Sequence, residues 1–201
     1  ITRGQFVAII GEVGSGKSSI LNSLLVENGA TFSKYNLFGI KTKNLTNDEI
    51  RSVFSFVPQE GFVISATLRD NVALDYLTTA THDTAIDQAL FSSQLDLEKD
   101  QKTLDTEIGE RGVNLSGGQK QRVSIARAAW FNRPIVLLDD CLSALDMDTE
   151  KKILDSLFLG AWKDKTRVLV THRLSVLPAV DHIFFIQKGR IVAQGTFDEL
   201  N

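Results

Sequence analysis

Three short apolar runs along the chain predict strands that are buried on both faces. The runs are Phe6–Ile10, Ile135–Leu138 and Arg167–Val170. They are continuous, without the alternation of apolar and polar residues that marks a half-exposed strand. Continuous apolar strands are typical of a parallel sheet that is covered on both faces.

Helical patterns lie between these strands. The first, Ser18–Leu25, directly follows the first strand. The second, Gln119–Phe131, ends shortly before Pro134, and the third, Thr149–Leu159, ends at Gly160. Strands that alternate with helices in this way predict an α/β fold.

Two segments depart from this alternation. Ile183–Ile186 and Arg190–Ala193 are short apolar runs on either side of Lys188-Gly189, which predicts a β-hairpin with a two-residue turn. The segment from about Ser65 to Asn114 is more polar, with helical patterns and no buried strand. It predicts a helical region that differs in character from the sheet.

A glycine-rich phosphate-binding loop (P-loop) lies between the first predicted strand and its helix. The backbone N–H groups of such a loop point inward around a phosphate, and the helix N-terminus adds its dipole. Lys17 is expected to reach the β- and γ-phosphates, and the Ser18 hydroxyl to bind Mg²⁺. A glycine-rich turn without a ligand is the alternative, which the strand–loop–helix context disfavours. The predicted ATP-binding residues are Gly11, Glu12, Val13, Gly14, Ser15, Gly16, Lys17, Ser18 and Ser19.

A second glycine-rich stretch precedes the helix predicted at Gln119–Phe131. Ser116 is a good N-cap residue, and Gln119 completes a capping box. The two glycines between them leave backbone N–H groups unshielded, which predicts a second anion site that one nucleotide cannot obviously fill together with the first. A helix cap without a ligand explains Ser116 and Gln119 but not the paired glycines. The stretch comprises Leu115, Ser116, Gly117, Gly118 and Gln119.

This stretch, running on through Lys120–Ala128, resembles the signature of the ATP-binding cassette (ABC) family. The resemblance covers nearly all of the chain and implies a P-loop NTPase core with a mostly parallel sheet. On that pattern the core takes 1–64 and 119–201, and an inserted helical subdomain takes 65–118. It also implies a head-to-tail dimer, in which the signature of one domain caps the γ-phosphate held by the P-loop of the other.

The strand at Ile135–Leu138 ends in a carboxylate, which is the Walker B arrangement. Asp139 is expected to hold Mg²⁺ opposite Ser18. The resemblance assigns the attacking water to the next residue, which is normally Glu in ABC ATPases that turn over well. Here it is Asp140, whose carboxylate lies one methylene nearer the backbone. A misplaced general base forfeits part of the roughly 10²–10⁴-fold that such catalysis contributes, so slow hydrolysis is expected.

Further positions match ABC motifs. Gln59 matches the Q-loop residue, which contacts Mg²⁺ and water, and His172 matches the switch histidine, which hydrogen-bonds the γ-phosphate. Without the flanking motifs, a solvated Gln and an unremarkable His would be expected there. His82 and His182 lack such context and are expected to be structural or exposed. The D-loop, which crosses the dimer interface in the family, is matched by Ser143, Ala144, Leu145 and Asp146.

Several stretches resemble exporters, and among them the first nucleotide-binding domain of the multidrug-resistance-associated subfamily C. Thr106–Gly112 resembles the X-loop, which contacts the membrane domains of exporters. The subfamily is matched by Gly112–Asn114 before the signature, by the Asp pair at 139–140, and by Thr171–Leu174 followed by Leu177-Pro178 and Asp181. Cys141, where the subfamily often has Pro, and the long connection Ile40–Arg51 depart from it. The strands and the adenine-stacking aromatic residue that usually precede the P-loop have no counterpart, so a trimmed or partial chain is expected.

Composition sets limits on the partners. The chain has 201 residues, of which 43% are hydrophobic, and a net charge of −3, which argues against nucleic acid as a main partner. No apolar run approaches the roughly 18 residues that span a bilayer. A single cysteine, Cys141, excludes an internal disulfide and fits a reducing cytosol, with a buried apolar role favoured over a reactive one.

Together these features predict an ATP-binding and ATP-hydrolysing domain of an ABC exporter, at the cytoplasmic face of a membrane. The expected cofactors are ATP and Mg²⁺. The expected partners are a second nucleotide-binding domain and the transmembrane domains of the same transporter. Two alternatives stay open: a regulatory domain that binds ATP without hydrolysing it, and a soluble ABC ATPase with no transport role.

Overall fold

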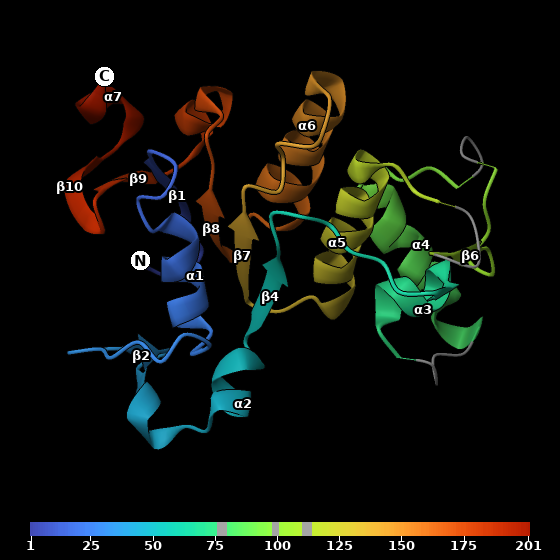
Figure 1. The fold of residues 1–201 in the computed structure, drawn as a ribbon, viewed down its shortest axis with the longest axis horizontal. Coiled ribbons are helices and arrows are strands. Elements are labelled where there is room, and N and C mark those ends of the chain that lie inside the picture. The colour runs from blue at the N-terminus through green and yellow to red at the C-terminus, as the bar shows by residue number, and fades with distance from the viewer. Residues whose placement is uncertain (76–79, 98–100, 110–113) are drawn as a thin grey trace. The chain divides into compact units, whose positions relative to one another are not determined.

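The computed structural model describes residues 1–75, 80–97, 101–109 and 114–201 (Figure 1). The chain divides into two compact units. The sheet unit comprises 1–56, 133–139 and 165–201, and the helical unit comprises 57–132 and 140–164.

A six-stranded sheet forms the centre of the sheet unit, in the order β10-β9-β1-β8-β7-β4. β1 is parallel to β8 and β9, β7 is parallel to β8, and β10 runs antiparallel to β9. The three predicted strands are confirmed within one residue at each end. The strands are β1 Phe6–Gly11, β4 Phe54–Val57, β7 Ile135–Asp139, β8 Thr166–Val170, β9 His182–Gln187 and β10 Arg190–Gly195.

The predicted hairpin is confirmed as β9 and β10. Lys188 and Gly189 both have positive φ angles, of 47° and 74°. Positive φ at both central residues matches the twist of the flanking strands in a two-residue turn. Register shifts between Ile191 and Ala193 mark a bulge in β10.

One face of this sheet is covered by α1 and neighbouring segments. Leu21 from α1 and Ile50 from α2 are buried in one cluster with Phe54, Leu137 and Val168 of the strands. The remaining elements of the unit are α1 Lys17–Leu24, β2 Asn36–Leu37, β3 Ile40–Lys41, η1 Thr42–Asn44, α2 Asn47–Arg51, η4 Leu174–Ala179 and α7 Phe197–Leu200.

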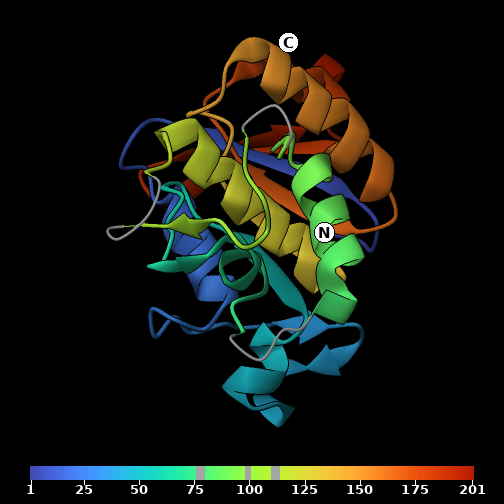
Figure 2. The same cartoon turned by 90° about the vertical axis from the view of Figure 1, so that its right-hand side faces the viewer.

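The helical unit is built around α5, against which α3 and α4 pack (Figure 2). Its core includes Leu68 and Val72 from α3, Ile86 and Leu90 from α4, and Val123 from α5, each fully buried. The helices are α3 Leu68–Ala73, η2 Ala80–His82, α4 Asp83–Ser92, α5 Gly117–Phe131, α6 Met147–Ile153 and the π-helical η3 Leu154–Ala161.

The structure corrects two expectations here. The region 65–114 contains a strand pair, β5 Ala66–Thr67 with β6 Glu107–Ile108, of which Ile108 is buried. Two residues are too few to produce a sequence period, which is why no strand was predicted. The helix expected to end at Gly160 runs on to Ala161 as a π-helical turn.

The two compact units are defined by packing, which is a different criterion from the predicted functional division at 65–118. Residues 119–132 and 140–164 pack in the helical unit, because the buried face of α5 contacts α3 and α4. The functional division into 1–64 and 119–201 as core and 65–118 as helical subdomain stays a prediction. No helix of the described residues is long and apolar enough to cross a membrane.

Candidate functional site

The P-loop starts where β1 ends, and its first glycine lies against the neighbouring strand. A Cβ atom on Gly11 would lie 2.1 Å from the carbonyl oxygen of Ile186 in β9, so no other residue fits without movement of the backbone. The Gly189 N–H, in the β9–β10 turn, donates a 3.0 Å hydrogen bond to the Ser15 carbonyl. Two contacts from the hairpin therefore fix the path of the loop, and sequence reasoning predicted neither.

The loop curls back on itself before α1 begins. The Ser15 N–H donates to the Glu12 carbonyl at 3.2 Å, and Gly16 takes the N-cap position with φ of 98°. Ser15 is 5% exposed, and its Oγ has no hydrogen-bond partner among the described residues. Buried polar atoms are normally satisfied, so an unpaired hydroxyl inside the loop fits a site built to bind a polar ligand.

Lys17 is the buried cation of this site. Its side chain is almost fully buried, and Nζ donates to the carbonyls of Gly11 at 2.9 Å and Glu12 at 2.7 Å. Both acceptors belong to the loop itself, so the ammonium group is held across the loop by neutral partners. A phosphate oxygen would replace a neutral acceptor with a charged one, which makes a stronger hydrogen bond.

Ser18 and Asp139 form the candidate metal site. The Ser18 hydroxyl donates a 2.9 Å hydrogen bond to Asp139 Oδ1 at the end of β7. Mg²⁺ is typically held by one or two carboxylates together with phosphate oxygens and water, rather than by a full protein cage. Among the described residues there is no cluster of three or more His, Cys, Asp or Glu that could hold a metal. The hydroxyl–carboxylate pair therefore fits Mg²⁺ that arrives with a phosphate ligand.

Asp140 begins the next segment of the helical unit. It has a positive φ of 42°, which is unusual for a non-glycine residue. Its side chain is buried, and Oδ1 has no hydrogen-bond partner in the described part of the chain. The Ser143 N–H and hydroxyl both donate to its backbone carbonyl, at 3.2 and 2.8 Å, which fixes the turn that sets this conformation.

The stretch Leu115–Gln119 caps α5 as predicted. The Ser116 hydroxyl accepts from the Gln119 N–H at 3.2 Å, and Gln119 Oε1 accepts from the Ser116 N–H at 3.0 Å. A Cβ on Gly117 would meet nothing within 4 Å, so its backbone is open to a ligand. A Cβ on Gly118 would lie 3.1 Å from the Ala144 carbonyl, which places the segment 143–146 against the helix start.

The segment 143–146 leads directly into α6. Asp146 is the N-cap of that helix and accepts from the Thr149 N–H at 2.9 Å. Hydrogen bonds from Thr149 hold the pKa of Asp146 below its usual value. The carboxylate thus has a local capping role, whatever it contacts in an assembly.

A sequence profile described as ABC transporter matches residues 1–143. The chain belongs to the ABC transporter family. It is 41% identical to a "Multidrug resistance protein" of Leishmania tarentolae over 98% of this chain and 12% of that protein. It is 39% identical to "ABC transporter C family member 2" of Dictyostelium discoideum, over 98% of this chain and 13% of that protein.

A solved structure of a bacterial Atm1-family ABC exporter with ATP bound shares the fold. The TM-score is 0.88 at 31% identity, and the match covers 100% of this chain and 35% of the exporter chain. The chain is therefore an ABC nucleotide-binding domain of the exporter type, similar to subfamily C, and it spans about an eighth of the length of the curated relatives named above. The α/β P-loop fold predicted from the sequence is confirmed.

The ABC motif residues divide between the two units. The sheet unit holds the P-loop and Asp139, which the Ser18 hydrogen bond joins, and the exposed His172, which follows β8. The helical unit holds Asp140, the exposed Gln59 and the signature Leu115–Gln119. Residues 110–112 of the X-loop lie outside the described residues, and the preceding Glu107–Ile108 forms β6. Cys141 is buried, as expected.

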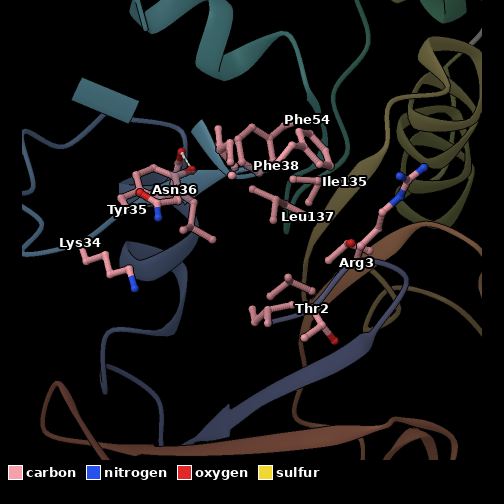
Figure 3. Close-up of a pocket in the computed structure, with 15 residues that line it drawn as sticks. Thr2, Arg3, Lys34, Tyr35, Asn36, Phe38, Phe54, Ile135 and Leu137 are labelled. Atoms are coloured by element: carbon pink, nitrogen blue, oxygen red, sulfur yellow. Dashed lines mark hydrogen bonds between the residues drawn. The ribbon is translucent and has the colours of Figure 1, made fainter. Parts of the chain in front are cut away.

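The sheet unit of this ABC domain also has a pocket of about 660 Å³ (Figure 3). Its apolar lining includes Phe54 and Ile135, the first residues of β4 and β7, and its charged lining residues are Arg3 and Lys34. The P-loop and Asp139 lie at the carboxyl ends of β1 and β7 instead. The pocket is therefore separate from the nucleotide site.

Proposed function

We propose that this chain binds Mg-ATP in its P-loop, hydrolyses it slowly, and works as one half of an ATP-driven head-to-tail dimer in an exporter. The observation that carries the proposal is the Ser18–Asp139 hydrogen bond beside a buried Lys17. A P-loop hydroxyl and a strand-end carboxylate held together are the donor set that Mg²⁺-nucleotide sites use.

Within the site each residue has a separate task. The backbone N–H groups from Gly11 to Ser19 surround the phosphates, and Lys17 neutralises their charge by leaving its own loop carbonyls. Ser18 and Asp139 hold Mg²⁺, with Gln59 as a third contact. Mg²⁺ held there would supply positive charge to offset the negative charge that develops on the transferred phosphoryl group.

Asp140 orients the attacking water, and His172 hydrogen-bonds the γ-phosphate. The side chain of Asp140 is one methylene shorter than Glu, so its carboxylate stops roughly an ångström short of the position a Glu would reach. An error of that size in positioning can cost about 10²-fold in rate, which supports slow turnover at this site.

The signature acts on a different nucleotide. In Leu115–Gln119 the N–H groups of Ser116 and Gln119 are used in the capping box, and the glycine pair between them presents its backbone at the start of α5, with free space around Gly117. The glycine N–H groups are suited to the γ-phosphate of ATP bound to a second domain, and the D-loop Ser143–Asp146 lies beside them. The relatives' length supports further domains in the whole protein, including transmembrane ones that would place this domain at the cytoplasmic face of a membrane.

The test compares Mg-ATP turnover of the chain with that of Asp140→Glu, using Lys17→Ala as the blank. High protein concentration is needed, because each site requires the signature of a second copy. A rise in rate on restoring Glu supports the proposal, and an already fast native chain that Glu leaves unchanged contradicts the slow-site assignment. Tight ATP binding with zero turnover in an assembled dimer would favour a regulatory, binding-only domain, and activity without membranes or transport would favour a soluble ABC ATPase.

A further inference from the structure

A charged residue is buried in the middle of α5, and its hydrogen bonds within the described part of the chain go to carbonyl oxygens. Arg127 is 5% exposed. Its guanidinium donates to the backbone carbonyl of Asn71, to Asn71 Oδ1 at 3.1 Å and to the Phe62 carbonyl at 2.8 Å. Its Cζ atom lies 4.1 Å from the centre of the Phe62 ring. Burying a charge is unfavourable unless it is fully hydrogen-bonded, so this arrangement indicates a specific task.

Burial lowers the pKa of Arg127 to about 10, which still leaves it a cation at neutral pH. The guanidinium holds the backbone carbonyls of Asn71 and Phe62 close to one another. Because its partners come from α3 and from the segment before β5, Arg127 joins three parts of the helical unit.

Asn71 extends the same network. It is fully buried, and its Nδ2 donates to the carbonyls of Ile64 and Thr67, both at 3.0 Å. Its Oδ1 accepts from the Ile64 N–H at 2.8 Å as well as from Arg127. The side-chain amide thus pairs with backbone N–H and carbonyl groups, as a neighbouring strand would, and fixes the backbone of 64–67.

The start of α5 holds the other side of the same segment. Gln121, which is 1% exposed, donates from Nε2 to the Pro58 carbonyl at 2.9 Å. A Cβ on Gly61 would lie 2.5 Å from the Gln121 nitrogen, so the backbone there touches the helix directly. Contacts with α5 therefore flank the exposed Gln59 on both sides.

We propose that Arg127, together with Asn71, is a positioning residue that fixes the Gln59 loop, residues 58–64, to the signature helix α5. The inference rests on the proposed function, since Gln59 matters only if it contacts the metal and water of the nucleotide site. One rigid helix then carries the signature at its start and, about three turns later, the anchor of the Gln59 loop.

Lysine cannot replace this arginine. The planar guanidinium reaches three acceptors on two segments at once and stacks on Phe62, whereas an ammonium is a single point charge. Arg127→Lys keeps the charge and releases the loop. The matched control is Arg122→Lys in the same helix, where Nη1 donates to the Gln94 carbonyl at 2.8 Å, away from the Gln59 loop.

The experiment measures amide hydrogen exchange over 58–67, ATP affinity, and turnover relative to the fraction folded, all in the full chain. In Arg127→Lys we expect exchange over 58–67 to rise about tenfold or more, since the charge-assisted bonds that close this segment are lost. ATP affinity should stay within about twofold, because the P-loop is in the other unit. Turnover should fall about tenfold beyond any loss in Arg122→Lys, and the Mg²⁺ concentration for half-maximal rate should rise.

Unchanged exchange over 58–67, or equal losses in Arg127→Lys and Arg122→Lys, would overturn the inference. If Arg127→Lys does not fold, Phe62→Leu removes the stacked ring and keeps the carbonyl, and exchange over 58–67 that matches the native chain would overturn it equally. Failure of the proposed function looks different: Lys17→Ala would bind ATP like the native chain. The exchange measurement without nucleotide is independent of that result.

Discussion

The Ser18 hydroxyl donates a 2.9 Å hydrogen bond to Asp139 across 121 residues of sequence. Ser18 follows β1, Asp139 ends β7, and β8 lies between these strands in the sheet. Since β1, β8 and β7 are parallel, their carboxyl ends meet at one edge, where ligands of open α/β sheets bind. The strand order thus explains why two distant motifs form one site.

Ser18→Ala should abolish the gain in ATP affinity that Mg²⁺ provides. The hydroxyl is one of the three protein contacts proposed for the metal, beside Asp139 and Gln59, so we expect a loss of roughly 10–100-fold in the Mg²⁺-dependent part of affinity. Titration of a fluorescent ATP analogue with Mg²⁺ and with EDTA measures it. Ser18→Thr keeps the hydroxyl and serves as control. If ATP affinity depends equally on Mg²⁺ in the native chain and in Ser18→Ala, the proposed metal site at Ser18 and Asp139 is wrong.

Gly11→Ala should destabilise the sheet unit more than Gly14→Ala does. The added methyl group would meet the Ile186 carbonyl at 2.1 Å, and forced repacking of this kind costs about 1–3 kcal/mol. At Gly14 the space is open and only the positive φ of 77° is unfavourable, at about 1 kcal/mol. Calorimetric Tm values, at about 2–4 °C per kcal/mol for this size, separate the two. A Tm lower for Gly14→Ala than for Gly11→Ala would show that the close contact between Gly11 and the Ile186 carbonyl does not determine stability here.

Two substitutions at Ser116 separate helix capping from phosphate binding. Ser116→Ala removes the N-cap and should cost about 1 kcal/mol of stability. Ser116→Asp keeps a capping oxygen but brings a negative charge to the anion site, so stability should be near native while ATP-dependent dimerisation is lost. Urea unfolding and sedimentation with Mg-ATP provide the two readouts. Dimerisation of Ser116→Asp at the native level would show that the signature contacts no phosphate.

The elements with strong local signals could be predicted from the sequence. β1, β7 and β8 are continuous apolar runs, and the capping box at Ser116 and Gln119 is a short-range pattern. In each case the determining residues are neighbours in the chain. Family resemblance then supplied the roles that residue types alone leave open, as for His172 and Gln59.

The contacts that hold the site in place could not be predicted in the same way. The Gly189–Ser15 hydrogen bond and the partners of Arg127 join residues far apart in sequence, and a backbone carbonyl as acceptor leaves no trace in residue type. An arginine in a helix is ordinarily expected on the surface. The two-residue strands β5 and β6 have no period to detect.

Asp83→Asn should weaken the decrease in the free energy of unfolding that occurs as pH falls. Arg69 donates to both Asp83 oxygens, at 2.7 and 3.0 Å, and these hydrogen bonds lower the pKa of Asp83 from its usual 3.8. The unfolded chain therefore takes up the proton first as pH falls. The stabilisation is complete above the unfolded pKa and is lost as pH falls through the lower folded one. Urea unfolding from about pH 6 to about pH 2 should show a smaller decrease in the free energy of unfolding for the variant than for the native chain.

Asp87→Asn is the control with opposite sign. Burial raises the pKa of Asp87, so the contribution of this residue to stability is lost as pH rises through its raised pKa. If the free energy of unfolding of the native chain and of Asp83→Asn falls equally with pH, the Arg69–Asp83 pair does not contribute to the acid dependence of stability.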